Sequence, residues 1–252
     1  MSLQIESTTE APVYAVVGAT GGIGAALSRR LAARGAKLFL GARDEAKLSA
    51  LGAELNAASQ NVDATVVEQV DAFIAQAIAT YGKLDGVVNC VGSLLLKPAH
   101  ITTIEEWDFT IRQNLNSAFY LLRAATKVMQ SRGGSIVLLS SAAARTGVAN
   151  HEAIAAAKAG VIGLTLSAAA SYAARGIRVN CVAPGLIATP LTARITGNEA
   201  SVKASAAMHA LGRIGAPEDV ASAIDWLLDS QNSWVTGQVI GVDGGLATVR
   251  PR

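Results

Sequence analysis

The chain has few aromatic residues and few charged ones. Of its 252 residues, 4% are aromatic and 16% are charged, whereas 51% are hydrophobic. The formal net charge is only +2 and no run of Lys or Arg stands out, which argues against nucleic acid or an anionic membrane as a partner. The length is sufficient for one sizeable α/β core.

Cysteine is also scarce, and no targeting signal is evident. The two cysteines, Cys90 and Cys181, lie far apart, which is typical of reduced thiols in a cytoplasmic protein. Residues 1–12 have neither the basic nor the apolar region of a signal peptide. No uninterrupted apolar run reaches the length of a membrane span, because Gly and Ser interrupt the Ala-rich stretch 161–174. We therefore expect a cytoplasmic protein with no membrane segment and no metal site.

The chain does contain a cluster of glycines directly after an apolar run. Residues 13–17 predict a buried strand, and a helical pattern of small residues begins near Gly22. Gly18 permits a tight turn, while Gly22 and Gly24 let a pyrophosphate approach the backbone at the positive end of the helix dipole. The spacing is G-x-x-x-G-x-G and not the general dinucleotide fingerprint, so this stretch alone is weak evidence for nucleotide binding.

Apolar runs alternate with helical patterns along the whole chain. This alternation predicts a single α/β domain over residues 1–252, with a doubly wound parallel sheet covered by helices on both faces. Residues 1–11 are expected to be loose. The expected strands are residues 13–17, 37–40, 60–64, 84–88, 135–139, 177–182 and 239–242, and the expected helices are residues 22–34, 45–55, 67–81, 104–130, 153–174 and 216–228.

The order of several short motifs resembles the short-chain dehydrogenase/reductase family over nearly the whole chain. These motifs are the glycine loop 18–24, Asn89-x-x-Gly92, Asn114 within a helix, Ser140-Ser141, Lys158, Pro184-Gly185 and Val242-Asp243-Gly244-Gly245. Each motif alone is weak, but the ordered set is specific. The resemblance implies a Rossmann fold with a seven-stranded parallel sheet, and a dinucleotide site at the carboxyl ends of the strands.

The end of the second predicted strand bears on the choice of cofactor. In dinucleotide enzymes of this kind, an acid there binds the ribose hydroxyls of NAD, whereas a nearby Arg pairs with the 2′-phosphate of NADP. Ala42 holds the place of the acid and Arg43 follows it, so we expect NADP(H). In the alternative interpretation Arg43 is solvated and Asp44 selects the cofactor, although Asp44 is better suited to capping a helix.

The other cofactor contacts follow from the resemblance alone. An Asp after the third strand would meet the adenine; Asp63-Ala64 fits this role, and Asp71 is a rival that would leave the following helix too short. The resemblance also implies that the cofactor contacts Gly18, Thr20, Gly21, Gly22, Ile23, Gly24, Asn89, Gly92, Lys158, Pro184, Gly185, Ile187 and Thr189.

The chain departs from the family at its catalytic tyrosine. The family places a Tyr one helical turn before its Lys, whose ammonium lowers the pKa of that Tyr and binds the nicotinamide ribose. Here the chain reads His151-Glu152-Ala153-Ile154-Ala155-Ala156-Ala157-Lys158, so this place holds Ile154, which cannot donate a proton. The resemblance assigns Ser141 to orienting the substrate carbonyl and Asn114 to a water chain that reaches Lys158.

Three interpretations of the chain remain open. The first is an NADP(H)-dependent oxidoreductase with an atypical proton donor, either His151 or a water held by Ser141 and Lys158; the alternative for His151 is an exposed residue at a helix start. The second is a catalytically silent NADP(H)-binding protein that senses the cofactor or supports a partner. The third is a variant engineered at Ile154. We favour the first, because a silent protein has less need of Ser141.

The predicted substrate loops are apolar. Ser93-Leu94-Leu95-Leu96 and residues 190–212 would flank the nicotinamide and, with Ile154, would form an apolar pocket. We expect an apolar carbonyl or alcohol substrate, or an acyl thioester. The predicted helices at 105–130 and 153–174 match the paired interface helices of the family, which predicts a homotetramer or a homodimer.

Overall fold

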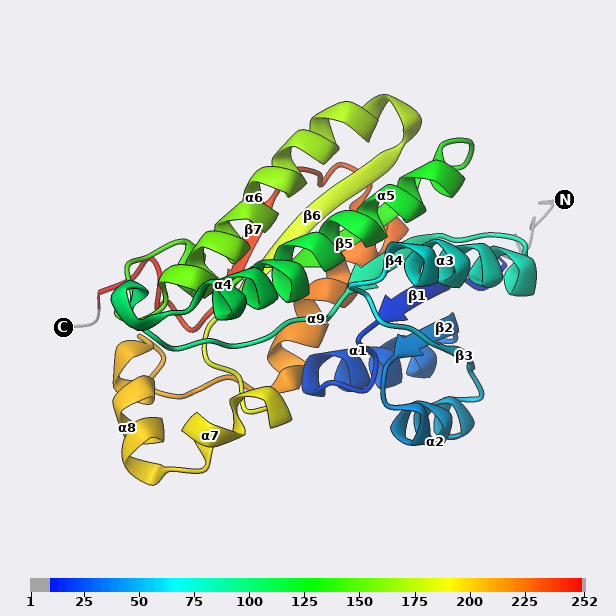
Figure 1. The fold of residues 1–252 in the computed structure, drawn as a ribbon. Helices are drawn as coiled ribbons and strands as arrows, with labels where there is room; N and C mark the ends of the chain where they lie inside the picture. The colour runs from blue at the N-terminus through cyan, green and yellow to red at the C-terminus, as the bar shows by residue number, and fades with distance from the viewer. Residues whose placement is uncertain (1–9, 251–252) are drawn as a thin grey trace, which may run out of the picture.

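A parallel sheet forms the centre of the molecule in the computed structural model, which describes residues 10–250 (Figure 1). The expectation of a loose N-terminus therefore falls mostly outside the described residues. Within this range seven strands pair in the order β3-β2-β1-β4-β5-β6-β7, and every pair is parallel. This confirms the predicted doubly wound Rossmann fold. The strands are β1 (Val13–Val17), β2 (Lys37–Ala42), β3 (Ala58–Asn61), β4 (Gly86–Asn89), β5 (Gly134–Leu139), β6 (Ile177–Pro184) and β7 (Val239–Val242).

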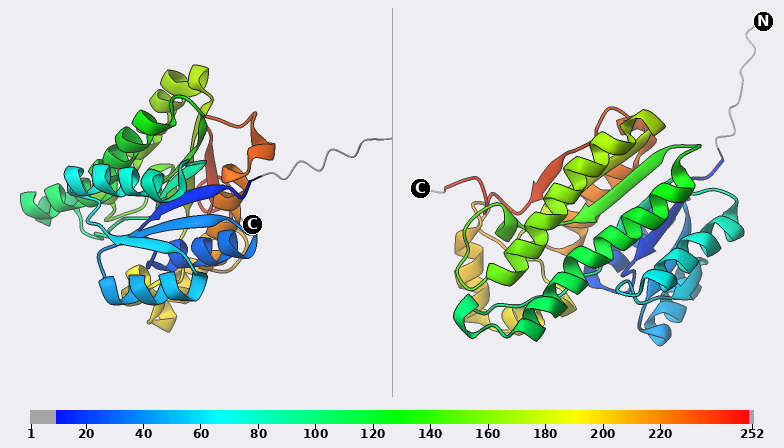
Figure 2. Two further views of the ribbon diagram at one scale, coloured as in Figure 1. Left: turned by 90° about the vertical axis from the view of Figure 1, so that its right-hand side faces the viewer. Right: turned by 45° about the horizontal axis from the view of Figure 1, so that its top comes forward.

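Helices cover both faces of the sheet (Figures 1 and 2). One buried cluster joins the sheet to α3, α5 and α6, and a second joins it to α1, α2 and α9. Parallel strands buried on both faces read as continuous apolar runs, as they do here. The helices are α1 (Gly22–Ala33), α2 (Glu45–Leu55), α3 (Val67–Tyr81), α4 (Ile104–Ile111), α5 (Ser117–Met129), α6 (Glu152–Tyr172), α7 (Ala193–Thr196), α8 (Glu199–Met208) and α9 (Pro217–Leu228).

The third strand lies earlier in the chain than predicted. The sequence predicts residues 60–64, whereas β3 pairs with β2 from Ala58 to Asn61. The strand stops because the Asp63 carboxylate accepts the N–H and the hydroxyl of Thr65, at 2.8 and 2.7 Å, and so turns the chain. Asp63 thus lies just beyond the carboxyl end of β3.

The helix predicted over residues 104–130 is interrupted by the π-helical turn Arg112–Asn116, between α4 and α5. The Asn114 amide in this turn donates to the Thr110 carbonyl, and the Ser117 hydroxyl donates to the Gln113 carbonyl. Such side-chain bonds to the preceding turn compete with the regular helical pattern. The turn directs Asn114, which is 1% exposed, into the molecule.

One further segment is more helical than the sequence analysis expected. Residues 190–212, expected as a loop region, contain a 3₁₀ turn followed by α7 and α8. In addition, Glu152–Arg175 is long and apolar enough to span a membrane, and it alone among the described helices meets that test. The helix passes this test by length and average composition and still contains Lys158, Ser167 and Ser171, so it does not contradict the expectation that no uninterrupted apolar run reaches that length. In this fold α6 packs against β5 and β6.

Candidate functional site

The glycine loop lies between β1 and α1, at the carboxyl edge of the sheet. Gly18 has a φ of +79°, and its N–H and that of Ala19 both donate to the Gly41 carbonyl on β2. A Cβ on Gly18 would lie 2.8 Å from the Cys90 carbonyl carbon, so only glycine allows this approach. Gly21 caps α1 without a side-chain hydrogen bond, which leaves N–H groups of the first helical turn for another acceptor.

A cleft of about 270 Å³ opens beside this loop and collects residues from the ends of four strands. A Cβ on Gly22 would lie 2.6 Å from Thr189 Cγ2, so Thr189 packs directly against the glycine loop, and both line the cleft. The structure brings ten predicted cofactor residues together along this cleft: Gly18, Thr20, Gly21, Gly22, Ile23, Arg43, Asp63, Ala64, Gly92 and Thr189.

Other predicted cofactor residues do not line the cleft. Gly24 packs against the backbone of the loop, because a Cβ there would overlap the Gly18 carbonyl oxygen. Asn89 is buried; its amide donates to the Ser117 hydroxyl at 3.2 Å and its oxygen accepts the Val91 N–H at 3.0 Å. Pro184, Gly185 and Ile187 lie at and after the end of β6 and do not line the cleft.

The cleft also contains residues that were not among the predicted cofactor contacts, although Leu191 belongs to the predicted substrate region 190–212. Val62, Cys90, Val91, Gln113 and Leu191 line it. Cys90 and Val91 lie inside the motif Asn89-x-x-Gly92, so the motif already marked their position. Gln113 precedes Asn114 in the π-helical turn, and no sequence signal predicted that turn.

At one end of the cleft lie the Arg43 guanidinium and the Asp63 carboxylate, whose charges attract each other. Burial raises the pKa of Asp63, but the hydrogen bonds from Thr65 and the Arg43 cation lower it on balance below its ordinary value. Asp44 is occupied otherwise: its carboxylate caps α2 by accepting the Lys47 N–H at 3.0 Å and pairs with the Lys47 ammonium at 2.8 Å. The rival Asp71 lies in α3 and pairs with Arg123 at 2.9 Å, away from the cleft.

Lys158 and Asn114 meet beside Gly92. A Cβ on Gly92 would lie 3.0 Å from Asn114 Oδ1 and 3.6 Å from Lys158 Nζ. The Lys158 ammonium donates to the Leu139 carbonyl at 2.9 Å, and Asn114 Oδ1 accepts the Ser93 N–H at 3.1 Å. Lys158 is 7% exposed, and this burial lowers its pKa to about 8.

The two neighbouring serines have different environments. Ser140 is buried and its hydroxyl donates to the Lys158 carbonyl at 2.8 Å, which joins β5 to α6. The Ser141 hydroxyl oxygen accepts the Ala143 N–H at 3.2 Å, and within residues 10–250 its own proton has no acceptor. Ser141 can therefore still donate a hydrogen bond to a ligand oxygen.

The position that the resemblance assigns to a catalytic tyrosine holds a buried aliphatic side chain. Ile154 is 4% exposed and lies one helical turn before Lys158 on α6. The four tyrosines of the chain lie elsewhere: Tyr81 donates to the Leu38 carbonyl, Tyr120 and Tyr172 pack on the core, and Tyr14 lines a separate cavity. No phenol in the chain replaces the missing one.

His151 lies at the start of α6, in contact with the preceding loop. Its Nδ1 lies 2.7 Å from the Ala149 carbonyl oxygen, which can only accept, so Nδ1 carries a proton. Among the described residues no hydrogen bond joins His151 to Ser141, Asn114 or Lys158. The structure therefore places His151 near the entrance of the helix and not within the Lys158 cluster.

Both cysteines are free, and both influence Lys158. Burial raises the pKa of Cys90 to about 12 and that of Cys181 to about 11, and the Lys158 cation opposes each shift. These thiols are therefore neutral at ordinary pH, and within residues 10–250 no ion pair joins Lys158 to a carboxylate.

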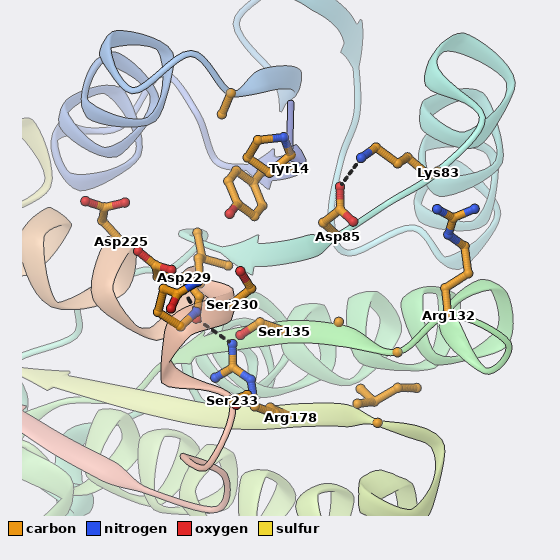
Figure 3. A pocket seen from close by; sticks show the side chains of 18 of the residues that line it. Tyr14, Lys83, Asp85, Arg132, Ser135, Arg178, Asp225, Asp229, Ser230 and Ser233 are labelled. Carbon is orange, nitrogen blue, oxygen red and sulfur yellow. Dashed lines mark hydrogen bonds and ion pairs between the residues drawn. The ribbon is translucent and has the colours of Figure 1, made fainter. Parts of the chain in front are cut away.

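A second and larger cavity, of about 960 Å³, lies at the amino ends of the strands, at the opposite edge of the sheet (Figure 3). Most of its charges are paired within the protein. Lys83 lies 3.2 Å from Asp85, Arg34 pairs with both Asp225 and Asp229, and Arg178 donates to backbone carbonyls. Burial, followed by the Asp85 charge, raises the pKa of Tyr14 to about 12. These pairs indicate a structural network at this edge.

Comparisons with known proteins identify the family. Residues 18–247 match the family model described as enoyl-(acyl carrier protein) reductase, so the chain belongs to the short-chain dehydrogenase/reductase family of NAD(P)-dependent oxidoreductases. It is 36% identical over 247 residues to 3-oxoacyl-[acyl-carrier-protein] reductase FabG of Thermotoga maritima, with 94% of this chain and 98% of that protein covered.

Another relative acts on a different substrate. The chain is 40% identical over 244 residues to cis-4-hydroxycyclohexanecarboxylate dehydrogenase of Sinomonas cyclohexanicum, with 94% of this chain and 97% of that protein covered. Among solved structures, actinorhodin polyketide ketoreductase with NADPH is similar at a TM-score of 0.90 and 30% identity, with 95% of this chain and 98% of that chain covered. The names of these relatives describe reductases and dehydrogenases that act on different substrates.

Proposed function

We propose that this protein is an NADP(H)-dependent oxidoreductase that interconverts an apolar carbonyl compound and its alcohol without a catalytic tyrosine. The observation that carries the proposal is that Lys158 and Asn114 meet beside Gly92, which lines the cleft. Ser141 follows Ser140, whose hydroxyl donates to the Lys158 carbonyl, and the Ser141 proton is available to a ligand. The relatives named as reductases and dehydrogenases support the same reaction class.

The cleft fits a dinucleotide phosphate. The uncapped first turn of α1 offers N–H groups to phosphate oxygens, and glycines leave room for them. Arg43 would hold a 2′-phosphate, whereas Ala42 offers no carboxylate to ribose hydroxyls. Asp63 with Ala64 would hold the adenine, and Lys158 would hold the nicotinamide ribose. The similar ketoreductase structure with NADPH supports this choice of cofactor.

When bound, the reduced nicotinamide supplies the hydride. Ser141 would orient the substrate oxygen by donating a hydrogen bond to it, and the Lys158 ammonium would favour the negative charge that develops there. Losing a positioned general acid typically costs about 10²–10⁴-fold in rate. We therefore expect slow turnover and not its complete loss.

The geometry favours a water held by Ser141 and Lys158 as the proton source over His151. In a neutral His151 ring the only proton is on Nδ1 and is already donated to the Ala149 carbonyl. Lys158 lies inside the site, and its lowered pKa of about 8 makes its ammonium a better acid than an ordinary lysine. Replacing His151 with Ala tests this directly: an unchanged rate supports the water, and a lost rate supports His151.

The substrate is proposed to be apolar because exposed aliphatic side chains lie on the two loop regions expected to flank it. Leu96 is 41% exposed, Leu191 54% and Leu211 73%. The deciding experiment follows NADPH oxidation at high enzyme concentration with a panel of ketones, aldehydes and acyl thioesters, with NADH in parallel. Turnover of any of them with NADPH supports the proposal.

The buried Ile154 favours a second candidate, a silent NADP(H)-binding protein that acts through a partner. The same panel distinguishes the two. No turnover with any substrate, together with NADPH binding in a fluorescence titration, would favour the second function.

We also propose that the protein is a homotetramer or a homodimer. Trp107 on α4, Phe119 on α5 and Leu166 on α6 are 40%, 47% and 51% exposed, which is typical of an interface. Trp234, near the start of β7, is 98% exposed and suits a second interface. Light scattering that shows a monomer would exclude both assemblies.

A further inference from the structure

A buried histidine joins the end of α8 to the segment that leaves β6. His209 is 3% exposed and follows the last residue of α8. Its Nδ1 lies 2.7 Å from the Ser205 carbonyl oxygen, and its Nε2 accepts the Leu186 N–H at 3.2 Å. Since a carbonyl only accepts and an amide N–H only donates, the ring is neutral and carries its proton on Nδ1.

The surrounding backbone is shaped to admit this ring. A Cβ on Gly185 would lie 2.6 Å from His209 Nε2, and one on Gly244 would lie 3.4 Å from His209 Cβ. The Leu211 N–H donates to the Gly244 carbonyl at 3.0 Å, directly beyond the histidine. The ring therefore sits where three segments meet: the exit from β6, the end of α8 and the turn after β7.

Two of these segments border the proposed site. The Leu186 amide is followed by Ile187 and by Thr189, which lines the cleft and packs against Gly22. The helix α8 belongs to residues 190–212, the region expected to cover the substrate. With both ring nitrogens engaged and the side chain buried, His209 has no proton to give to a substrate, so its effect is exerted through Leu186.

We propose that His209 is a positioning residue that fixes the turn at residues 184–187 relative to α8, so that the cleft wall and the substrate-covering region are set together. This inference rests on the proposed oxidoreductase function. Without the imidazole, the partly buried Leu186 N–H would lack its acceptor, and the turn would lose its link to α8.

Three variants test the proposal. His209→Leu keeps an apolar side chain of similar size but has no acceptor, whereas His209→Gln restores a carbonyl oxygen for Leu186 and an amide for Ser205. Lys203→Leu is the matched control, because Lys203 is exposed on the same helix. Each is measured by hydrogen exchange resolved to the Leu186 amide, by NADPH titration, and by the single-turnover rate of NADPH oxidation.

We expect the Leu variant to lose protection at the Leu186 amide and about tenfold or more in single-turnover rate, the scale set by an unpaired buried N–H. The Gln variant should recover most of both, and the Lys203 control should match wild type. An unchanged Leu186 exchange in the Leu variant overturns the inference. So does lost protection with an unchanged rate and NADPH affinity.

The two proposals fail in different ways. If the wild-type protein neither binds NADPH nor oxidises it with any substrate, the oxidoreductase function fails, and the positioning role fails with it. If wild type is active and the Leu variant folds and exchanges as wild type, only the role of His209 fails. If the Leu variant does not fold, the Gln variant takes its place. A Gln variant whose single-turnover rate of NADPH oxidation and Leu186 protection both fall below one tenth of the wild-type values would overturn the predicted rescue.

Discussion

Replacing Ile154 with tyrosine places a phenol one helical turn before the buried Lys158. A positioned general acid contributes about 10²–10⁴-fold to such a rate, which corresponds to about 3–5 kcal/mol of barrier. Below the Lys158 pKa of about 8, the ammonium is present to stabilise the developing phenolate. We therefore expect NADPH oxidation to accelerate by about 10²-fold or more in the Ile154→Tyr variant.

The larger side chain has a cost in stability. Ile154 is 4% exposed, so an added ring must displace packed neighbours, at about 1–3 kcal/mol of unfolding free energy. Ile154→Phe is the matched control, because it introduces the same ring without the hydroxyl. Thermal unfolding of both variants should show a similar loss, and only the Tyr variant should gain rate.

The assay is stopped-flow NADPH oxidation with the best substrate from the panel, at equal saturation with cofactor. The reasoning is refuted if the Tyr variant binds NADPH as wild type does and yet is no faster than the Phe variant. That result would mean that position 154 does not face the reacting oxygen, or that another group already supplies the proton efficiently.

Four further predictions concern the cofactor cleft, Lys158 and the ion pairs that support the fold. Arg43→Ala should weaken NADPH binding about tenfold or more, while NADH affinity stays unchanged, because only the 2′-phosphate loses its partner; fluorescence titration with both cofactors checks this. If the Lys158 ammonium supplies the proton, the single-turnover reduction rate should fall as pH rises through about 8, and a flat profile between pH 7 and 10 would contradict this role. Lys158 should also raise the free energy of unfolding as pH rises from about 8 to 10.5, because over this range the unfolded chain keeps a proton on Lys158 that the folded protein has lost. Denaturant titration of wild type and Lys158→Met measures the difference. Asp225→Ala should lower the unfolding free energy by about 1–3 kcal/mol, since its buried carboxylate pairs with Arg30 and Arg34, whereas Asp44→Ala on the surface should cost about 1 kcal/mol as a lost helix cap.

Local patterns in the sequence were sufficient for most of the fold. The apolar run before Gly18 and the small residues after it predicted β1 and α1, because a buried strand and a helix each impose their own periodicity. The same logic placed α3 and α9, the latter with Pro217 in its first turn. The order of these elements then limited the topology to a doubly wound parallel sheet.

Hydrophobic periodicity predicted the wrong element bounds where side-chain hydrogen bonds changed the backbone conformation locally. The Asp63–Thr65 turn ended β3 early, and the bonds of Asn114 and Ser117 to the preceding turn opened a π-helical segment in a run that reads as one helix. Neither effect changes hydrophobic periodicity, so neither was visible in the sequence. Both nevertheless shape the cleft, since Asp63 and the π-helical turn contribute to its walls.

From the sequence alone we predicted that Ile154 occupies the place of an acid, that Lys158 and Ser141 are retained, and that Ala42, followed by Arg43, stands where an NAD-binding acid would be. The environments of these residues depend on the tertiary structure. The pKa of Lys158 depends on burial beside Leu139, Cys90 and Cys181, and the state of His209 depends on Ser205 and Leu186. Residue types are local properties of a chain, but burial and hydrogen-bond partners arise only when segments distant in sequence are packed together.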